Sequence, residues 1–327
     1  MTGAGAARHS GGLVTLGETM GLLNPLDAGP LHHAPSFRLT MAGSESNVAI
    51  AARRLGVPAT WIGKVGADDL GDLIERELRA EGVRTLGLRA PAAPTGLMLK
   101  TRRIGQLTSV RYYRAGSAGA ELDVADLDEK LIRAASVLHL TGITPALGPR
   151  PAAAVRAAIG IARSNGVPVS FDVNYRAGLW SLAEAGPVLR ELVKQADVVF
   201  ASEHEAALLA GSATDIARTP DELARQLAGL GPSQVVIKRG ARGCVALVGD
   251  VWHRLEALPV QLVDPVGAGD AFVGGYLAEL VSGRDPDTRL ATATAAGAFA
   301  VTVAGDWEGL PHRTELALLA NSDDVIR

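Results

Sequence analysis

Apolar strand-like runs alternate with amphipathic helical segments along most of this chain, and this alternation limits the possible folds more than any other feature. Strand-like runs cover residues 13–17, 60–66, 136–140, 167–173, 197–200 and 234–238, and helical segments cover 47–56, 69–82, 150–165, 183–195 and 203–210. Strands that alternate with helices at this spacing favour a parallel sheet covered by helices on both faces. We therefore predict a three-layer α/β/α sandwich with a mainly parallel central sheet.

Two segments interrupt the alternation. Residues 18–42 show weak period-2 character, whereas residues 95–114 alternate clearly around a Gly105-Gln106 turn, which is typical of a β-hairpin. We expect both segments to form a small β-sheet lid on the main domain. Residues 1–12 are small and polar, and they predict a flexible N-terminal tail before a single domain at 13–327.

Composition excludes several classes of protein. Of 327 residues, 47% are hydrophobic, which is enough for a full core and excludes wholesale disorder. A formal net charge of −3 gives no reason to expect a nucleic-acid partner, and no apolar run is long enough to span a membrane. The single cysteine, Cys244, cannot form a disulfide within the chain, as is typical of a reducing compartment. We expect a cytoplasmic protein without nucleic-acid or membrane partners.

The most informative segment is a glycine-rich turn at 264–275. We interpret Val260–Val263 as a strand that leads into Gly267-Ala-Gly-Asp270, after which a helix of small residues begins. Glycines allow a tight turn, and the free N–H groups at a helix start bind anions. Asp270 would lie in the first helical turn, where an aspartate is most often a cap. It could equally accept a proton during phosphoryl transfer, and we expect the helix dipole to keep it ionised.

The turn and a second segment together resemble a known family. Asp264-Pro-Val-Gly-Ala-Gly-Asp-Ala-Phe resembles the C-terminal signature of the ribokinase (PfkB) family of carbohydrate kinases, and residues 42–56 and 63–71 resemble its N-terminal signature. The resemblance extends from Leu13 to about Pro311. It implies a ribokinase-like fold, ATP and Mg²⁺ as cofactors, and a monovalent cation as a further candidate.

The resemblance also implies roles for individual residues. Asp270 would be the catalytic base, and the turn residues Gly267, Ala268 and Gly269 would form the anion hole. The cofactor-binding residues would be Asn174, Ser202, Lys238, Gly240, Gly243, Gly267 and Gly269. Glu205 would help to position Mg²⁺ through water. The family pattern N-x-x-E reads Ser202-Glu-His-Glu205 here, so a shorter side chain replaces the asparagine. A simple turn between two strands would explain the glycines at 240 and 243 equally well.

Other stretches indicate the substrate. YYRAGSAGA at 112–120, FDVNYRAGLW at 171–180, GSESN at 43–47 and GDWEGLP at 305–311 resemble the 2-keto-3-deoxygluconate kinase branch of the family. This branch implies ATP-dependent phosphorylation of an acidic keto sugar, namely 2-keto-3-deoxygluconate, to its 6-phosphate. The substrate-binding residues would be Gly43, Asn47, Met98, Tyr113, Arg114, Arg176 and Asp270. Arginine forks suit a carboxylate, whereas Met98 departs from the tyrosine common in this branch.

Other functions remain open on the sequence alone. The chain could be another PfkB sugar kinase, for example one for fructose or another keto acid, or a sugar-binding regulator without turnover. A dinucleotide-dependent oxidoreductase is disfavoured, because no G-x-G-x-x-G follows the first strand. Since an exposed β lid commonly needs a cover, we also expect a homo-oligomer, a dimer or higher.

Overall fold

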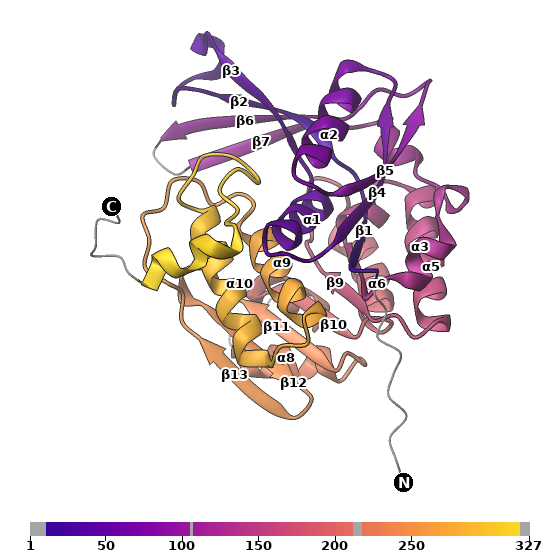
Figure 1. Ribbon diagram of the computed structural model, residues 1–327, viewed down its shortest axis with the longest axis vertical. Helices are drawn as coiled ribbons and strands as arrows, with labels where there is room; N and C mark the ends of the chain where they lie inside the picture. Colours follow the sequence, from indigo (N-terminus) through magenta and orange to yellow (C-terminus); the bar gives the residue numbers. More distant parts are fainter. Residues whose placement is uncertain (1–10, 105–106, 212–217, 321–327) are drawn as a thin grey trace.

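A nine-stranded sheet forms the centre of the computed structural model, which describes residues 11–104, 107–211 and 218–320 (Figure 1). From edge to edge its strands are β13 (Val251–Leu255), β12 (Cys244–Val248), β11 (Gln234–Lys238), β10 (Val198–Ser202), β9 (Val169–Asp172), β8 (Val137–Thr141), β1 (Leu13–Leu16), β4 (Ala59–Gly66) and β5 (Arg84–Ala90). Only the pairings of β12 with β11 and with β13 are antiparallel among these strands. The predicted, mainly parallel sheet is confirmed.

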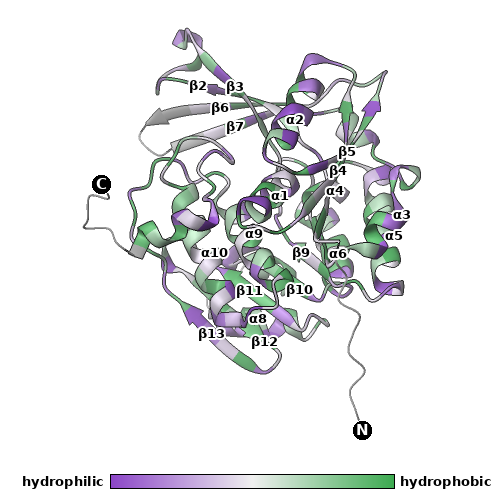
Figure 2. Ribbon diagram, in the orientation of Figure 1, coloured by the Kyte–Doolittle hydropathy of each residue, from purple (hydrophilic) through white to green (hydrophobic). Residues whose placement is uncertain are grey.

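Helices cover both faces of the sheet. One face packs against α1 (Ser44–Arg54), α2 (Asp69–Ala80), α9 (Ala268–Val281) and α10 (Pro286–Ala300). The other packs against α3 (Glu129–Ala134), α5 (Pro149–Ser164), α6 (Leu182–Val193), α7 (Glu203–Leu209) and α8 (Pro220–Ala228). Leu13 belongs to the first core and Val14 to the second, because successive side chains of a strand point to opposite faces. Both faces of the sheet therefore carry an apolar core. Figure 2 shows that hydrophobic residues prevail along the central strands.

A separate four-stranded sheet forms the lid. Its order is β3 (Phe37–Ala42), β2 (Met20–Pro25), β6 (Leu97–Ile104) and β7 (Leu107–Tyr113). Only three residues join the end of β1 to the start of β2, so the lid lies at the carboxyl end of the main strands, where α/β proteins bind ligands. Figure 1 shows the lid at one end of the molecule. The separate small sheet is confirmed, and its strands lie within the expected segments 18–42 and 95–114.

The structure differs from the predictions at residues 260–263 and at the start of the ordered chain. Val260–Val263 is not a strand, because the amides of Val263 and Asp264 both donate to the carbonyl of Val301 rather than to a neighbouring strand. Order begins before residue 13, since Gly11 already donates to Ala134. The remainder of the expected tail and the Gly105-Gln106 turn lie outside the described residues.

Within the described ranges, no helix is long and apolar enough to cross a membrane. The lid leaves β3 and β7 as sheet edges, and Leu39 and Tyr113 are about half exposed on it. The homo-oligomer stays a prediction.

Asp68 joins the lid to the main domain, and its removal provides a test of this junction. Its carboxylate caps α2 by accepting from the amide of Gly71, and it also accepts from the amide and hydroxyl of Thr95 just before β6. Burial raises the pKa of Asp68, but these hydrogen bonds outweigh the effect of burial, so its pKa is lowered. The ionised carboxylate therefore stabilises the folded state at neutral pH, and this contribution is lost as pH falls through the lowered pKa. We expect Asp68→Ala to reduce the free energy of unfolding by about 2 kcal/mol in urea titrations at neutral pH.

Asp72→Ala is the matched control. This carboxylate lies on the same helix but is 72% exposed and paired only with Arg89. Its loss should cost less than about 1 kcal/mol. Equal losses for the two variants would show that Asp68 does not hold the junction together.

Candidate active site

A left-handed glycine opens the turn at the start of α9. Gly267 has φ +82°, and a Cβ there would lie 1.9 Å from the carbonyl oxygen of Asp306, so only glycine fits. The amide of Ala271 donates back to Gly267, which leaves the amides of residues 268–270 without acceptors inside the helix. These donors, together with the positive end of the helix dipole, are suited to binding an anion, and we refer to them as the anion-binding amides.

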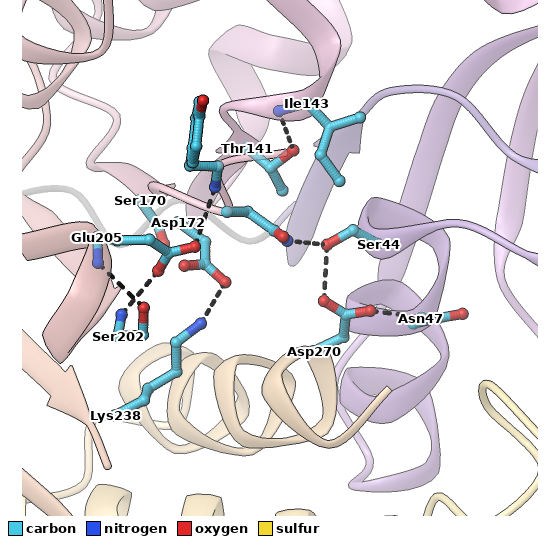
Figure 3. Close-up of polar contacts among 12 residues, drawn as sticks. Ser44, Asn47, Thr141, Ile143, Ser170, Asp172, Ser202, Glu205, Lys238 and Asp270 are labelled. Carbon is cyan, nitrogen blue, oxygen red and sulfur yellow. Dashed lines mark hydrogen bonds and ion pairs between the residues drawn. The ribbon is translucent and has the colours of Figure 1, made fainter. Parts of the chain in front are cut away.

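Asp270 lies in the first turn of α9 and is held from α1. The Ser44 hydroxyl donates to its Oδ1 at 2.6 Å, and the Asn47 amide donates to its Oδ2 at 2.9 Å (Figure 3). Both oxygens thus accept hydrogen bonds, as an ionised carboxylate does. Because both donors come from a single helix, the carboxylate has one fixed orientation.

The pKa of Asp270 is shifted in the direction opposite to the one that we expected from the helix dipole. Burial raises the pKa of Asp270 above its usual value, and the bonds from Ser44 and Asn47 and the charges of Arg176 and Lys238 offset only part of that rise. Desolvation therefore outweighs these groups, all of which favour the charged form. A carboxylate with a raised pKa is a stronger base once it is ionised, which suits a proton acceptor.

Asn174 continues the hydrogen-bonded chain toward β9. It has φ +38°, the one non-glycine residue with positive φ in the described ranges, and its side-chain amide donates to the Ser44 hydroxyl at 2.8 Å. Strained backbone of this kind persists where surrounding contacts fix it, and it is common at functional sites. Ser44 thus accepts from Asn174 and donates to Asp270.

A second charged group lies across from Asp270. The Lys238 ammonium at the end of β11 is 2.6 Å from Oδ2 of Asp172 at the end of β9. Burial raises the pKa of Asp172 to about 6, although the Lys238 charge lowers it. The pKa of Lys238 itself is raised, because the carboxylates of Asp172, Glu205 and Asp270 outweigh its burial. A Cβ at Gly269 would lie only 3.6 Å from Nζ, so this cation adjoins the anion-binding amides.

Glu205 and Ser202 form a capping box at the start of α7. Glu205 accepts from the amide of Ser202 at 2.7 Å and from the amide of Tyr175 at 2.9 Å, and Ser202 accepts in return from the amide of Glu205. The serine that replaces the expected asparagine is therefore a helix cap. Glu205 still faces the cleft beside Asp172.

The residues suit a water-mediated metal better than a direct one. In the described part of the chain no three acidic, histidine or cysteine side chains gather closely enough to hold a metal ion alone. Asp172 Oδ1 is buried without a hydrogen-bond partner, and Glu205 lies beside it. Mg²⁺ usually keeps several waters and uses one or two carboxylates together with phosphate oxygens, so this pair fits it.

A cleft of about 500 Å³ collects most of the expected site residues between the lid and the main sheet. The expected residues that line it are Gly43, Met98, Arg114, Asn174, Arg176, Ser202, Glu205, Lys238, Gly240, Gly267, Gly269 and Asp270. Its volume is in the range of sites that hold small molecules.

The structure places Tyr112 rather than Tyr113 in this cleft. Tyr112 is paired with Met98 across the lid sheet, and both line the cleft. Tyr113 points to the opposite face of the lid and is 55% exposed, since neighbouring strand residues alternate. The expected substrate-facing tyrosine is therefore corrected from Tyr113 to Tyr112, whose ring lies 5.3 Å from the Arg114 guanidinium carbon.

Three other expected residues do not line the cleft. Asn47 is buried behind Asp270, where it also donates to Asp306 at 3.0 Å. Gly243 has φ +79° and packs against the backbone of Leu255, which supports the plain turn interpretation. Ala268 offers a backbone amide at the start of α9 and lies outside the lining residues.

The two arginines have different environments. Arg114 is buried, and its guanidinium donates to the fully buried Glu18 carboxylate, so its charge is already balanced. Arg176 is exposed and lines the cleft. It lies close enough to Asp270 for its charge to offset part of the rise in the pKa of Asp270. None of the ion pairs in the described ranges involves Arg176.

Several residues that line the cleft were not predicted from the sequence. They are Glu18, Ser44, Glu45, Tyr112 and Asp172. Burial raises the pKa of Glu45 to about 7, and it accepts from the hydroxyls of Thr141 and Thr144. Ser44 and Asp172 lie inside stretches that had been singled out, and their positions at a helix start and a strand end could have identified them.

Comparison with known proteins agrees with this geometry. The chain is 37% identical over 308 residues to a 2-dehydro-3-deoxygluconokinase of Thermoproteus tenax, covering 93% of this chain and 92% of the relative. The structure of a 2-dehydro-3-deoxygluconokinase from Thermotoga maritima superposes with a TM-score of 0.86 at 30% identity, covering 94% of this chain and 98% of that one. An E. coli protein assigned as Ribokinase II and solved in complex with ATP and Mg²⁺ also gives 0.86 at 27% identity, covering 95% and 99%.

The family model described as pfkB family carbohydrate kinase matches residues 11–313, almost the whole of the described chain. The chain therefore belongs to the pfkB family of carbohydrate kinases.

Proposed function

We propose that this kinase transfers the γ-phosphoryl group of ATP to a hydroxyl of a sugar acid, namely the 6-hydroxyl of 2-keto-3-deoxygluconate. The observation that carries the proposal is the position of Arg176, a cation without an ion-pair partner in the described ranges, beside Asp270 in the cleft. The relatives named 2-dehydro-3-deoxygluconokinase support the same substrate class.

The nucleotide phosphates would bind at the start of α9. The amides of residues 268–270 and the Lys238 ammonium offer donors and positive charge on one side of the cleft. Gly240 also lines the cleft, and open space around its Cα position leaves its backbone accessible. ATP would supply the transferable phosphoryl group, while Mg²⁺ beside Asp172 and Glu205 would neutralise phosphate charge. The E. coli relative solved with ATP and Mg²⁺ supports these two cofactors.

Asp270 would accept the proton of the attacking hydroxyl. Its carboxylate is fixed by Ser44 and Asn47 and lies beside the anion-binding amides, so base and phosphoryl site adjoin. As the new O–P bond forms, the hydroxyl proton passes to Asp270, and the bond between the γ-phosphorus and the oxygen of the leaving ADP breaks. The amides and Lys238 stabilise the negative charge of the transferred group throughout.

The sugar would lie between Asp270 and the lid. Gly43, Met98 and Tyr112 form the wall on the lid side, and Arg176 faces them from the main domain. A free guanidinium in a closing cleft favours a carboxylate over a neutral group. Arg114, already neutralised by Glu18, would donate hydrogen bonds without adding net charge. A sugar acid thus suits this cleft better than fructose.

Replacing the base gives the first test of this mechanism. Asp270→Asn keeps the size of the side chain and its bond from Ser44, so the fold should survive. Because the proton acceptor is lost, we expect kcat to fall by about 10²–10⁴-fold, while the dissociation constants for ATP and the sugar acid change little. Steady-state kinetics and calorimetric binding measure both quantities.

Asp285→Asn is the matched control, since Asp285 caps the start of α10 through Thr288 and lies outside the cleft. It should lower stability by about 1 kcal/mol or less and leave turnover normal. Near-normal turnover in Asp270→Asn, with a stability loss like that of the control, would mean that Asp270 is only a cap.

The charge of Arg176 gives the second test. Arg176→Ala should raise KM for 2-keto-3-deoxygluconate by about tenfold or more, because a hydrogen bond to a charged group is worth roughly 1.5–3 kcal/mol. KM for ATP and any slow reaction with neutral sugars should stay nearly unchanged. A coupled assay of ADP release over a panel of keto acids and hexoses measures these values.

Arg76→Ala, which removes an exposed arginine of α2 outside the cleft, serves as the control and should leave every constant unchanged. If the wild-type enzyme phosphorylates fructose as efficiently as the keto acid, the sugar-acid assignment is wrong.

A further inference from the structure

A buried lysine reaches from the lid to the base of the catalytic turn. Lys100 lies in β6, two residues after Met98 on the same side of the strand, and it is 1% exposed. Its Nζ donates to the carbonyl of Gly305 at 2.7 Å and to Oδ2 of Asp264 at 3.1 Å, and it lies 3.6 Å from Oδ1 of Asp306. All three partners belong to the main domain.

The partners of Lys100 shape the turn that carries the anion-binding amides. Asp264 begins that turn, where its Oδ1 accepts from the amide of Val266 and its Oδ2 accepts from the amide of Gly305. One carboxylate therefore joins the turn to the 305–306 loop, and the Lys100 ammonium balances its charge.

The same loop adjoins Asp270 by a second route. The Asp306 carbonyl packs so closely against Gly267 that any side chain at 267 would clash with it. The Asp306 carboxylate accepts from the side-chain amide of Asn47, and the same amide donates to Asp270. Burial raises the pKa of Asp306 to about 6, and the Lys100 charge acts against that rise.

The donor set around Nζ has a recognisable chemistry. Two carboxylates and one backbone carbonyl surround the ammonium with oxygens. It donates to Asp264 and to Gly305, whereas Asp306 is an ion-pair partner without a hydrogen bond. Oxygen ligands of this kind also suit a hard cation. A buried charge without partners is costly, so the two aspartates require a fixed cation at this place.

We propose that Lys100 is a positioning residue that acts as the built-in cation of the catalytic turn, holding residues 264–270 and 305–306 in place from the lid strand. This inference rests on the proposed kinase reaction and deepens it. It assigns to a side chain the work that a monovalent cation would otherwise do, and it makes turnover depend on contact between lid and turn.

The test compares Lys100→Met with wild type in chloride salts of equal ionic strength, of choline, sodium, potassium and ammonium. Wild type should turn over the sugar acid equally in all four. Lys100→Met should lose about 10–100-fold in kcat in choline, because small misplacement of the catalytic groups is enough for such a loss, with much smaller changes in KM. Ammonium or potassium should raise the kcat of Lys100→Met about tenfold above its value in choline.

Lys64→Met is the matched control. Lys64 is also ion-paired and largely buried, and it contacts a carboxylate of Asp126 and the carbonyl of Glu121, but it lies outside the cleft. Its kcat should stay near wild type with no response to the cation. An equal loss in this variant would overturn the proposal, and so would an unchanged kcat in Lys100→Met or equal recovery in all salts.

Hydrogen exchange separates this proposal from the substrate assignment, because it needs no turnover. In Lys100→Met, peptides that cover 264–270 and 301–308 should exchange faster than in wild type and slow again in ammonium, since the Val266 and Gly305 amides depend on Asp264. Wild-type exchange rates in the variant would overturn the proposal. If the variant does not fold, the salt series of the wild-type enzyme tests the proposal by itself. Equal turnover in all four salts would support a built-in cation, and a requirement for potassium would contradict it.

Discussion

The close packing of α1 against α9 is the constraint on which the rest of the site depends. A Cβ at Gly274 would lie 2.4 Å from the Cβ of Ala51, so this glycine allows the two helices to approach. Their first turns then meet, and Ser44 and Asn47 reach Asp270 across more than 220 residues of sequence. Both helices start at the carboxyl end of the sheet, so the anion-binding amides and the base share one place without any long loop. The catalytic geometry is therefore a product of core packing.

Buried carboxylates and the lysines paired with them are the second feature on which the site depends. Burial raises the pKa values of Glu45, Asp172 and Asp306, a cost that a core without function would avoid. Lysines offset part of this cost: Lys238 faces Asp172, and Lys100 faces Asp306. Of the three cations that line the cleft, Arg114, Arg176 and Lys238, only Arg176 forms no ion pair with a described residue. This contrast explains why we assign the substrate charge to Arg176 rather than to the neutralised Arg114.

The sequence predicted the sheet, the lid segments and the glycine turn, because periodicity and glycine chemistry are local properties. It did not predict which lid tyrosine faces the cleft, since that depends on the register of β7 against β6, and Tyr112 rather than Tyr113 lies opposite Met98. Val260–Val263 has the composition of a strand, but the amide of Val263 donates to Val301 at the end of α10, which only the tertiary structure reveals. The raised pKa of Asp270 likewise depends on desolvation by segments far apart in the chain. The pairing of Lys100 with Asp264 joins residues that lie 164 positions apart, so no local sequence pattern predicts it.

The central claim is that one carboxylate and one helix start bring the sugar hydroxyl and the phosphoryl group together. A crystal structure with a non-hydrolysable ATP analogue, Mg²⁺ and 2-keto-3-deoxygluconate tests it most directly. We predict the terminal phosphate at the amides of residues 268–270, the sugar carboxylate at Arg176, and the reacting hydroxyl about 2.6–3.2 Å from Asp270. A hydroxyl placed beyond reach of Asp270, or a phosphate bound away from the start of α9, would contradict the account.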